Sequence, residues 1–267
     1  MCMKRFIGIW MSALLLLSAC SSVPLTGRKQ ILLVSEQEVL SASLTQYADY
    51  MKTATKSTSK DGTAVVSRVG KNIAEATEQY LRNNGLENEI KNFSWEFSLV
   101  ADQQVNAFCM PGGKIVVYEG LMKVINSEDE LAVVIGHEVA HAVAKHSNER
   151  MSQQMMAQYG AQILGQALSK KSVAIQQIGT SVFGLGAQYG VMLPFSRKHE
   201  YEADYMGLIF MAMAGYNPES AVAFWQKMSD GNSASTPEFM STHPSDAARI
   251  AEIKRRLPEI QKYQIKK

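Results

Sequence analysis

A glutamate and two histidines stand inside an unusually apolar helix, and this feature constrains the fold of the chain more than any other. Residues 127–130 (Ser-Glu-Asp-Glu) predict the helix start, because acidic side chains in the first turn suit the helix dipole. The run continues as Leu-Ala-Val-Val-Ile-Gly and then His-Glu-Val-Ala-His at 137–141. A helix this apolar must be buried, and burying imidazoles and a carboxylate is costly unless something compensates them.

The spacing of the two histidines suits a shared metal ion. His137 and His141 are four residues apart, which places them about 40° apart around the helix axis and one turn along it. Glu138 is the next residue and can reach a water molecule on that metal. This is the His-Glu-x-x-His pattern of zinc proteases. The alternative is a pair of core histidines satisfied by hydrogen bonds.

A second acidic segment, residues 199–204 (His-Glu-Tyr-Glu-Ala-Asp), offers a third metal ligand. A catalytic zinc takes three protein ligands and keeps one position open. Glu200 and Asp204 are four residues apart on one helical face, whereas Glu202 lies about 200° round from Glu200. We therefore predict Glu200 as the ligand and Asp204 as the acceptor for the free N–H of a ligand histidine. The alternative is a solvated acidic face.

The remaining histidines are sorted by their angular position. His146 lies about 180° from His137 on a continuous helix, so we predict a surface position for it at the helix end. His199 lies about 100° from Glu200 and is not expected to share the metal. His243 precedes a helix predicted over residues 246–256. It could reach the site as a transition-state donor or as a displaceable fourth ligand, or it could be structural.

The first residues are typical of an export signal. Lys4 and Arg5 precede an uncharged apolar run over residues 6–19, which is too short to span a bilayer comfortably. The run closes with Leu-Ser-Ala before Cys20, which resembles the bacterial lipobox. We therefore predict a lipoprotein signal peptide over residues 1–19 and lipid on Cys20; an uncleaved membrane anchor is the alternative.

The predicted cleavage also bears on location and charge. Residues 20–34 then form the lipidated N-terminus and a tether. Ser21 follows Cys20 where an Asp could stand, and by resemblance to lipoprotein sorting rules this favours the periplasmic face of the outer membrane. The chain has 27 Lys and Arg against 25 Asp and Glu, and Lys4 and Arg5 account for the excess. With no net positive charge in the mature chain, nucleic-acid binding driven by bulk charge is not expected.

The rest of the chain indicates an α+β fold, mostly helical, with a small β-sheet beside the active-site helix. Residues 35–267 are expected to form this domain. Strands cluster early and helices lie on both sides of them along the chain. The uncharged run over residues 172–196 predicts a buried or amphipathic helix pair rather than a membrane span, with a lid over the site as one possible role. Helices are expected at 35–52 and 65–81, strands at 93–100, 107–109 and 114–118, and a turn at 111–113.

The chain resembles the M48 family of zinc metallopeptidases, specifically its small bacterial outer-membrane lipoprotein branch. The resemblance covers nearly all of the mature chain. It includes residues 24–30, 35–36, 106–108, 111–113, 137–141, 200–204 and 243–245. The family implies a gluzincin-type α+β fold, endopeptidase activity and one Zn²⁺ per chain.

The resemblance also implies roles for particular residues. It makes His137, His141 and Glu200 the zinc ligands and Glu138 the catalytic base. In zincins an edge strand beside the site pairs with the substrate backbone, and by position this strand should contain Asn106, Ala107 and Phe108. Cys109 departs from the small residue often found at its position, and we do not expect it to be catalytic.

The sequence therefore predicts a membrane-tethered zinc metalloendopeptidase. Its expected substrates are extended or misfolded envelope polypeptides, because pairing with an edge strand recognises backbone more than side chains. Its protein partners are not indicated. One alternative is an outer-membrane assembly factor or holdase-type chaperone whose zinc site is regulatory. Another is a lipoprotein with structural zinc, although structural sites are usually closed by four ligands and rich in cysteine.

Overall fold

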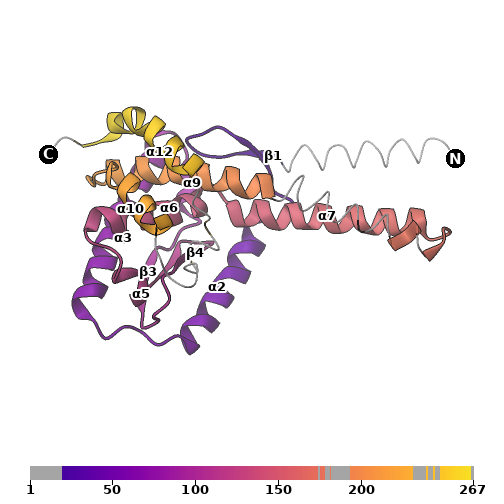
Figure 1. The fold of residues 1–267 in the computed structure, drawn as a ribbon, viewed down its shortest axis with the longest axis horizontal. Helices are drawn as coiled ribbons and strands as arrows, with labels where there is room; N and C mark the ends of the chain where they lie inside the picture. Colours follow the sequence, from indigo (N-terminus) through magenta and orange to yellow (C-terminus); the bar gives the residue numbers. More distant parts are fainter. Residues whose placement is uncertain are drawn as a thin grey trace. The chain divides into compact units, whose positions relative to one another are not determined.

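A computed structural model describes residues 20–173, 175–177, 181, 193–230, 239, 243 and 247–265. The predicted signal peptide over 1–19 and most of the uncharged run over 172–196 lie outside the described residues. The chain divides into two compact units (Figure 1). One contains the described residues of Met1–Val39 and Lys145–Arg197, and the other those of Leu40–Ala144 and Lys198–Lys267.

The larger unit is built on a three-stranded sheet with the order β3-β5-β4. The strands are β3 (Glu96–Val100), β4 (Ala107–Met110) and β5 (Lys114–Tyr118). β3 runs parallel to β5, and β4 runs antiparallel to it. The turn from β4 to β5 needs Gly112 and Gly113, whose φ angles are +92° and +83°. All three expected strands are present, and β4 is an edge strand of this sheet.

The first strand is shorter than its sequence pattern predicts. β5 begins at Lys114, so the residues before Glu96 have no strand beside them, although the N–H of Ser94 still donates to the carbonyl oxygen of Gly112. Phe93 and Trp95 nevertheless continue an aromatic ladder, with ring centroids 4.5 Å apart. The alternation of aromatic and polar residues therefore extends beyond the strand itself.

Helices cover both faces of the sheet (Figure 1). On one face, α2 (Glu36–Thr53) buries Tyr47 against Val116 and Tyr118. On the other, α3 (Lys60–Asn83) packs closely enough that a Cβ on Gly70 would meet the ring of Phe97. α6 (Glu128–Val143) also packs on the sheet, mainly against β4.

Helix α3 begins before the position that its apolar pattern indicates. The polar residues 56–63 suggest a break, but Ser59 caps the helix by accepting a hydrogen bond from the N–H of Gly62. The first turn of α3 is therefore polar because it is exposed. The remaining elements of this unit are α4 (Glu87–Ile90), α5 (Glu119–Met122), α10 (Ser220–Asp230), α12 (Ala247–Ile260) and the 3₁₀ helix η2 (Gln261–Tyr263).

The buried helix α6 meets α9 (Leu193–Met213) at a point of very close backbone approach. A Cβ on Gly136 would lie 2.7 Å from the carbonyl oxygen of Gly207, and a Cβ on Gly207 would lie 2.6 Å from the carbonyl carbon of Gly136. Only glycine fits at both positions. This contact lets side chains of the two helices share one site.

The smaller unit contains β1 (Cys20–Ser22), β2 (Lys29–Ile31) and α7 (His146–Leu168). The segment over 20–34, expected as a tether, contains an antiparallel pair of strands that is fastened to α7. Arg28 forms two hydrogen bonds with the buried carboxylate of Glu149, at 2.9 and 2.7 Å. No helix among the described residues combines the length and apolar character needed to cross a bilayer.

Candidate metal centre

Helix α6 carries His137, Glu138 and His141. It starts as its sequence predicts, because the hydroxyl of Ser127 accepts a hydrogen bond from the N–H of Glu130 at 3.2 Å. His137 and Glu138 are 1% and 2% exposed. The Nε2 atoms of His137 and His141 lie 3.0 Å apart, so both imidazoles face one point.

Helix α9 adds two carboxylates to this point. Glu200 Oε2 lies 3.3 Å from His137 Nε2, and Glu200 Oε1 lies 3.5 Å from His141 Nε2. On the far side of the first imidazole, Asp204 Oδ1 lies 3.0 Å from His137 Nδ1. The structure therefore brings together the residues that the sequence predicts as ligands, with Asp204 where an orienting acceptor should be.

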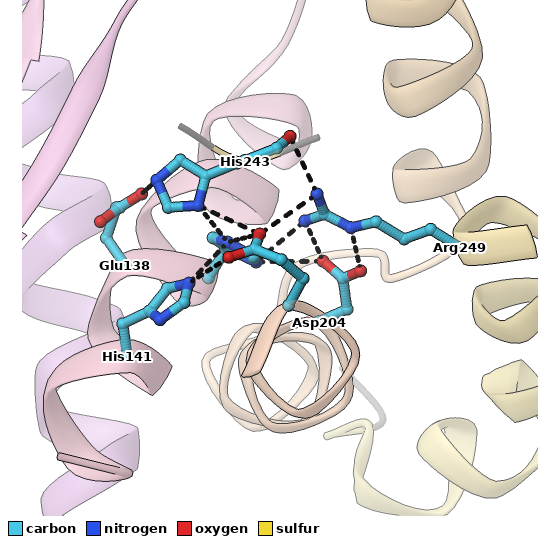
Figure 2. A network of polar contacts seen from close by, with 7 residues as sticks. Glu138, His141, Asp204, His243 and Arg249 are labelled. Carbon is cyan, nitrogen blue, oxygen red and sulfur yellow. Dashed lines mark hydrogen bonds and ion pairs between the residues drawn. The ribbon is translucent and has the colours of Figure 1, made fainter. Parts of the chain in front are cut away.

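His243 completes the cluster from outside these helices. Its Nδ1 lies 3.2 Å from His137 Nε2 and 3.1 Å from Glu200 Oε2, while its Nε2 lies 3.4 Å from Glu138 Oε1 (Figure 2). One potential metal-ligand atom from each of His137, His141, Glu200 and His243 lies within 4.8 Å of the other three.

These four residues fit a divalent metal ion by distance. Four atoms held about 2.0–2.1 Å from one centre at tetrahedral angles are about 3.3–3.4 Å apart. Apart from the pair of His141 and His243, the separations between ligand atoms of these four residues run from 3.0 to 3.5 Å. Nitrogen and carboxylate ligands at this spacing are the set that zinc prefers.

The charges of the buried side chains, and two carboxylate oxygens without a hydrogen bond, also indicate a site for a divalent metal ion. Glu138, Glu200 and Asp204 contribute three buried negative charges, and Arg249 contributes one positive charge. With neutral imidazoles the cluster is short of two positive charges, which a divalent ion supplies. The buried Oε1 atoms of Glu138 and Glu200 also find no hydrogen-bond donor in the described part of the chain.

The electrostatics of the metal-free cluster reflect the same deficit. Burial by itself opposes charge on His137, but hydrogen bonds to Asp204 and Glu200 outweigh it and raise the pKa of His137 to about 9. Burial would likewise raise the pKa of Glu200, yet hydrogen bonds from His137 and His243 hold it far below its usual range. Burial raises the pKa of Glu138. In the metal-free chain, a proton on His137 therefore supplies part of the positive charge that a metal ion would supply.

The edge strand β4 lies beside the cluster, and helix α6 packs against this strand. Along β4, Phe108 and Met110 face α2, so Ala107 and Cys109 face α6. The backbone N–H of Cys109 donates a hydrogen bond to Glu138, which links the edge strand to that carboxylate. Just before the strand, the buried side-chain oxygen of Asn106 has no hydrogen-bond partner among the described residues.

Two predictions about the other histidines have different outcomes. His199 and His146 are both buried, and neither belongs to the potential metal-binding group formed by the four residues above. The predicted surface position of His146 is wrong, because that side chain is 1% exposed. The chain turns at Lys145, where φ is +58°, and a new helix begins. An angle counted along one continuous helix does not apply beyond that turn.

Arg249 and Trp225 border the cluster, and neither belongs to a motif that the sequence displays. The guanidinium of Arg249 pairs with Asp204 and lies 3.9 Å above the ring of Trp225. A signal for Arg249 was present in the sequence. Arg249 and Ile253 are one turn apart on the buried stripe of α12, and an arginine on an apolar stripe needs a buried partner.

This α+β fold and this buried cluster together define a metalloendopeptidase domain, a hydrolase of peptide bonds. Comparison with known sequences gives the family: residues 67–257 match the model of peptidase family M48, and the chain belongs to that family. The gluzincin-type fold class predicted from the sequence is confirmed, as is the resemblance at the level of the family.

The chain is similar to two groups of curated relatives. It is 32% identical to the mitochondrial metalloendopeptidase OMA1 of Schizosaccharomyces pombe over 255 residues, covering 90% of this chain and 67% of that protein. It is 28% identical to the beta-barrel assembly-enhancing protease of Escherichia coli over 192 residues, covering 67% of this chain and 38% of that protein. The OMA1 of Arabidopsis thaliana is 39% identical over 160 residues, and the chain spans 31% of it. Most of these relatives are thus much longer than the matched region.

Proposed function

We propose that this chain is a zinc metalloendopeptidase, tethered to a membrane by lipid, that cleaves extended or misfolded polypeptides of the cell envelope. The observation that carries the proposal is the buried set of His137, His141 and Glu200, with Glu138 beside it. A glutamate next to a catalytic metal site is the arrangement of a general base, whereas a purely structural site has no use for it.

The residues divide the work as follows. His137, His141 and Glu200 would hold the ion, which when bound would supply Lewis-acid activation of a water molecule and of a carbonyl group. Glu138 takes a proton from the attacking water and delivers it to the leaving amine. The hydrogen bond that Glu138 accepts from the backbone N–H of Cys109 keeps this carboxylate aligned with β4.

The edge strand supports the proposed substrate class. A polypeptide that pairs with β4 is held through its backbone, so an extended segment of many sequences can bind. The buried side-chain oxygen of Asn106 can accept an N–H from such a segment, and the backbone groups of Ala107, which face away from β5, can pair with it. Most strands of a folded protein are already paired or covered, so fewer of its segments can bind in this way.

The decisive test is Glu138→Gln, which keeps the size of the side chain and removes the base. We expect cleavage of a denatured protein to fall by about 10²- to 10⁴-fold while zinc content stays at one per chain. Glu128→Gln is the matched control, because Glu128 lies on the same helix and forms only an exposed ion pair with Arg68. Cleavage by Glu138→Gln at the rate of the wild type would show that the proposed mechanism is wrong.

His243 keeps two possible roles within this proposal, as fourth ligand or as donor to the transition state. Its Nδ1 lies at the fourth corner of the metal-binding set, so water and substrate reach the site when the imidazole withdraws. The variant His243→Ala separates the two roles. A rise in cleavage indicates a displaceable ligand, and a fall without loss of zinc indicates a donor.

Envelope location is supported by Cys20 and by the assembly-enhancing protease of Escherichia coli among the relatives. Cys20→Ser should abolish lipid labelling and release the chain from the membrane fraction. An assembly factor with a regulatory zinc site remains the rival. It predicts that Glu138→Gln still supports the envelope phenotype of the wild type, and a proteolytic role predicts that it does not.

A further inference from the structure

Arg249 is a charged side chain buried within the larger unit. Only 1% of it is exposed. Its Nε donates to Asp204 Oδ2 at 2.5 Å and its Nη2 donates to Asp204 Oδ1 at 2.8 Å, so the pair is bidentate. The ring of Trp225 lies 3.9 Å from Cζ and closes one face of the guanidinium. The plane of this group is therefore fixed by its surroundings.

The third nitrogen of the same group points towards other parts of the site (Figure 2). Nη1 donates to the backbone carbonyl of His243 at 3.2 Å and lies 3.3 Å from Glu200 Oε2. An arginine that only balanced the charge of Asp204 would need no more than the bidentate pair. Here every nitrogen faces a group that belongs to a metal-binding residue or orients one.

The contact with Asp204 reaches the first histidine. Nη2 of Arg249 lies 3.3 Å from His137 Nδ1, and both nitrogens lie within 3.0 Å of Asp204 Oδ1. The carboxylate is thus held in the position from which it accepts the N–H of His137. That hydrogen bond presents His137 Nε2 to the ion.

We propose that Arg249 is the positioning residue of the metal centre: one guanidinium orients His137 through Asp204, steadies Glu200, and fastens His243 by its carbonyl. This inference rests on the proposed function of the same site. Arg249 comes from α12, which carries no metal ligand, so it joins three separate parts of the chain that must converge. A lysine at this position carries all its donors on one nitrogen, so it cannot reproduce the bidentate pair with Asp204 while also reaching Glu200 and the His243 carbonyl from the opposite side of a flat group.

The test compares Arg249→Lys with Arg256→Lys on the same helix. Arg256 lies over the ring of Tyr205, with its Cζ 4.5 Å from the centroid, and pairs with Glu252, away from the metal-binding set. Zinc affinity is measured by chelator competition, and kcat and KM by cleavage of an unfolded protein. Thermal unfolding of the metal-free chains establishes that both variants are folded at the assay temperature.

We expect Arg249→Lys to bind zinc about 10- to 100-fold more weakly, as is typical when a group that orients metal ligands is lost. Its kcat should fall by a larger factor than its KM changes. Arg256→Lys should stay within about twofold of the wild type, since it disturbs only partly exposed contacts. Folded Arg249→Lys with the zinc affinity and kcat of Arg256→Lys would overturn the proposal. A merely structural arginine changes the unfolding temperature alone.

If Arg249→Lys does not fold, the double variant Asp204→Asn/Arg249→Gln is compared with Asp204→Asn, because the arginine keeps its contacts with Glu200 and the His243 carbonyl in the single variant and loses them in the double variant. Weaker zinc binding by the double variant supports the proposal, and equal binding overturns it. Failure of the proposed function has a different signature. In that case the wild type itself binds no zinc or Glu138→Gln retains cleavage, whatever Arg249 does.

Discussion

The contact between Gly136 and Gly207 makes a remote, quantitative prediction about the metal centre. In Gly207→Ala the new Cβ would lie 2.6 Å from the carbonyl carbon of Gly136 and 2.7 Å from the N–H nitrogen of His137. Ordinary contacts begin near 3.4 Å, so α6 and α9 must separate by roughly 0.8 Å along that direction. Metal–ligand distances tolerate only about 0.2 Å.

Two effects of Gly207→Ala should appear together. Overpacking of this kind costs about 1–3 kcal/mol, which for a domain of this size lowers the unfolding temperature by about 2–12 °C. Zinc affinity should fall by about 10- to 100-fold, because His137 and Glu200 come from the two helices that are forced apart. The first effect is measured by calorimetry of the metal-free chain and the second by chelator competition.

The matched control is Gly165→Ala in helix α7, where the new Cβ meets nothing within 4 Å. Alanine is favoured over glycine in a helix by up to about 1 kcal/mol, so this variant should be as stable as the wild type or slightly more stable. The reasoning is refuted if Gly207→Ala unfolds within 1 °C of the wild type and binds zinc equally well, within about the error of such measurements.

Three further predictions concern pH, the amino-terminal strands and the thiol. In the metal-free chain the pKa of His137 is raised from 6.5 to about 9, so about 3 kcal/mol of stability is present below pH 6.5 and is lost as pH rises through 9. Urea unfolding should show this loss, and saturating zinc should remove it because the metal binds neutral imidazoles. Arg28→Met leaves the buried carboxylate of Glu149 without its main partner and should lower the free energy of unfolding by about 3 kcal/mol. The control Lys52→Met, at an exposed ion pair, should lower it by less than about 0.5 kcal/mol. Equal urea midpoints for the two variants would contradict this prediction. Desolvation raises the pKa of the partly exposed Cys109 thiol well above its usual range, so an aromatic disulfide reagent should modify this thiol at pH 8 more slowly in the folded chain than after unfolding, and equal rates would contradict the structure.

Much of the site could be predicted from local sequence. The four-residue spacing of His137 and His141, and that of Glu200 and Asp204, needs only the geometry of a helix. The same geometry explains why Glu202 is not in the metal-binding group. A period of 3.6 residues, read along an apolar helix, is a local property, and the sequence displays it directly.

Local sequence patterns did not predict three features of the backbone. The angle assigned to His146 assumed one helix through Lys145, and the left-handed conformation of that residue ends the assumption. The polar start of α3 resembled a loop because its first turn is exposed. Residues 20–34 resembled a tether because strands of three residues are too short to show a period.

The sequence by itself determined the chemistry: a helix so apolar that it must be buried, carrying two imidazoles and a carboxylate that require a counter-charge. Tertiary structure alone decided which distant groups complete the centre. His243 and Arg249 reach it from a loop and from α12, and the glycine contact sets the distance between the two ligand-bearing helices. The contact of His243 with Glu200 joins residues 43 positions apart and that of Arg249 with His137 joins residues 112 positions apart, and no periodicity along a chain encodes which of its segments will pack together.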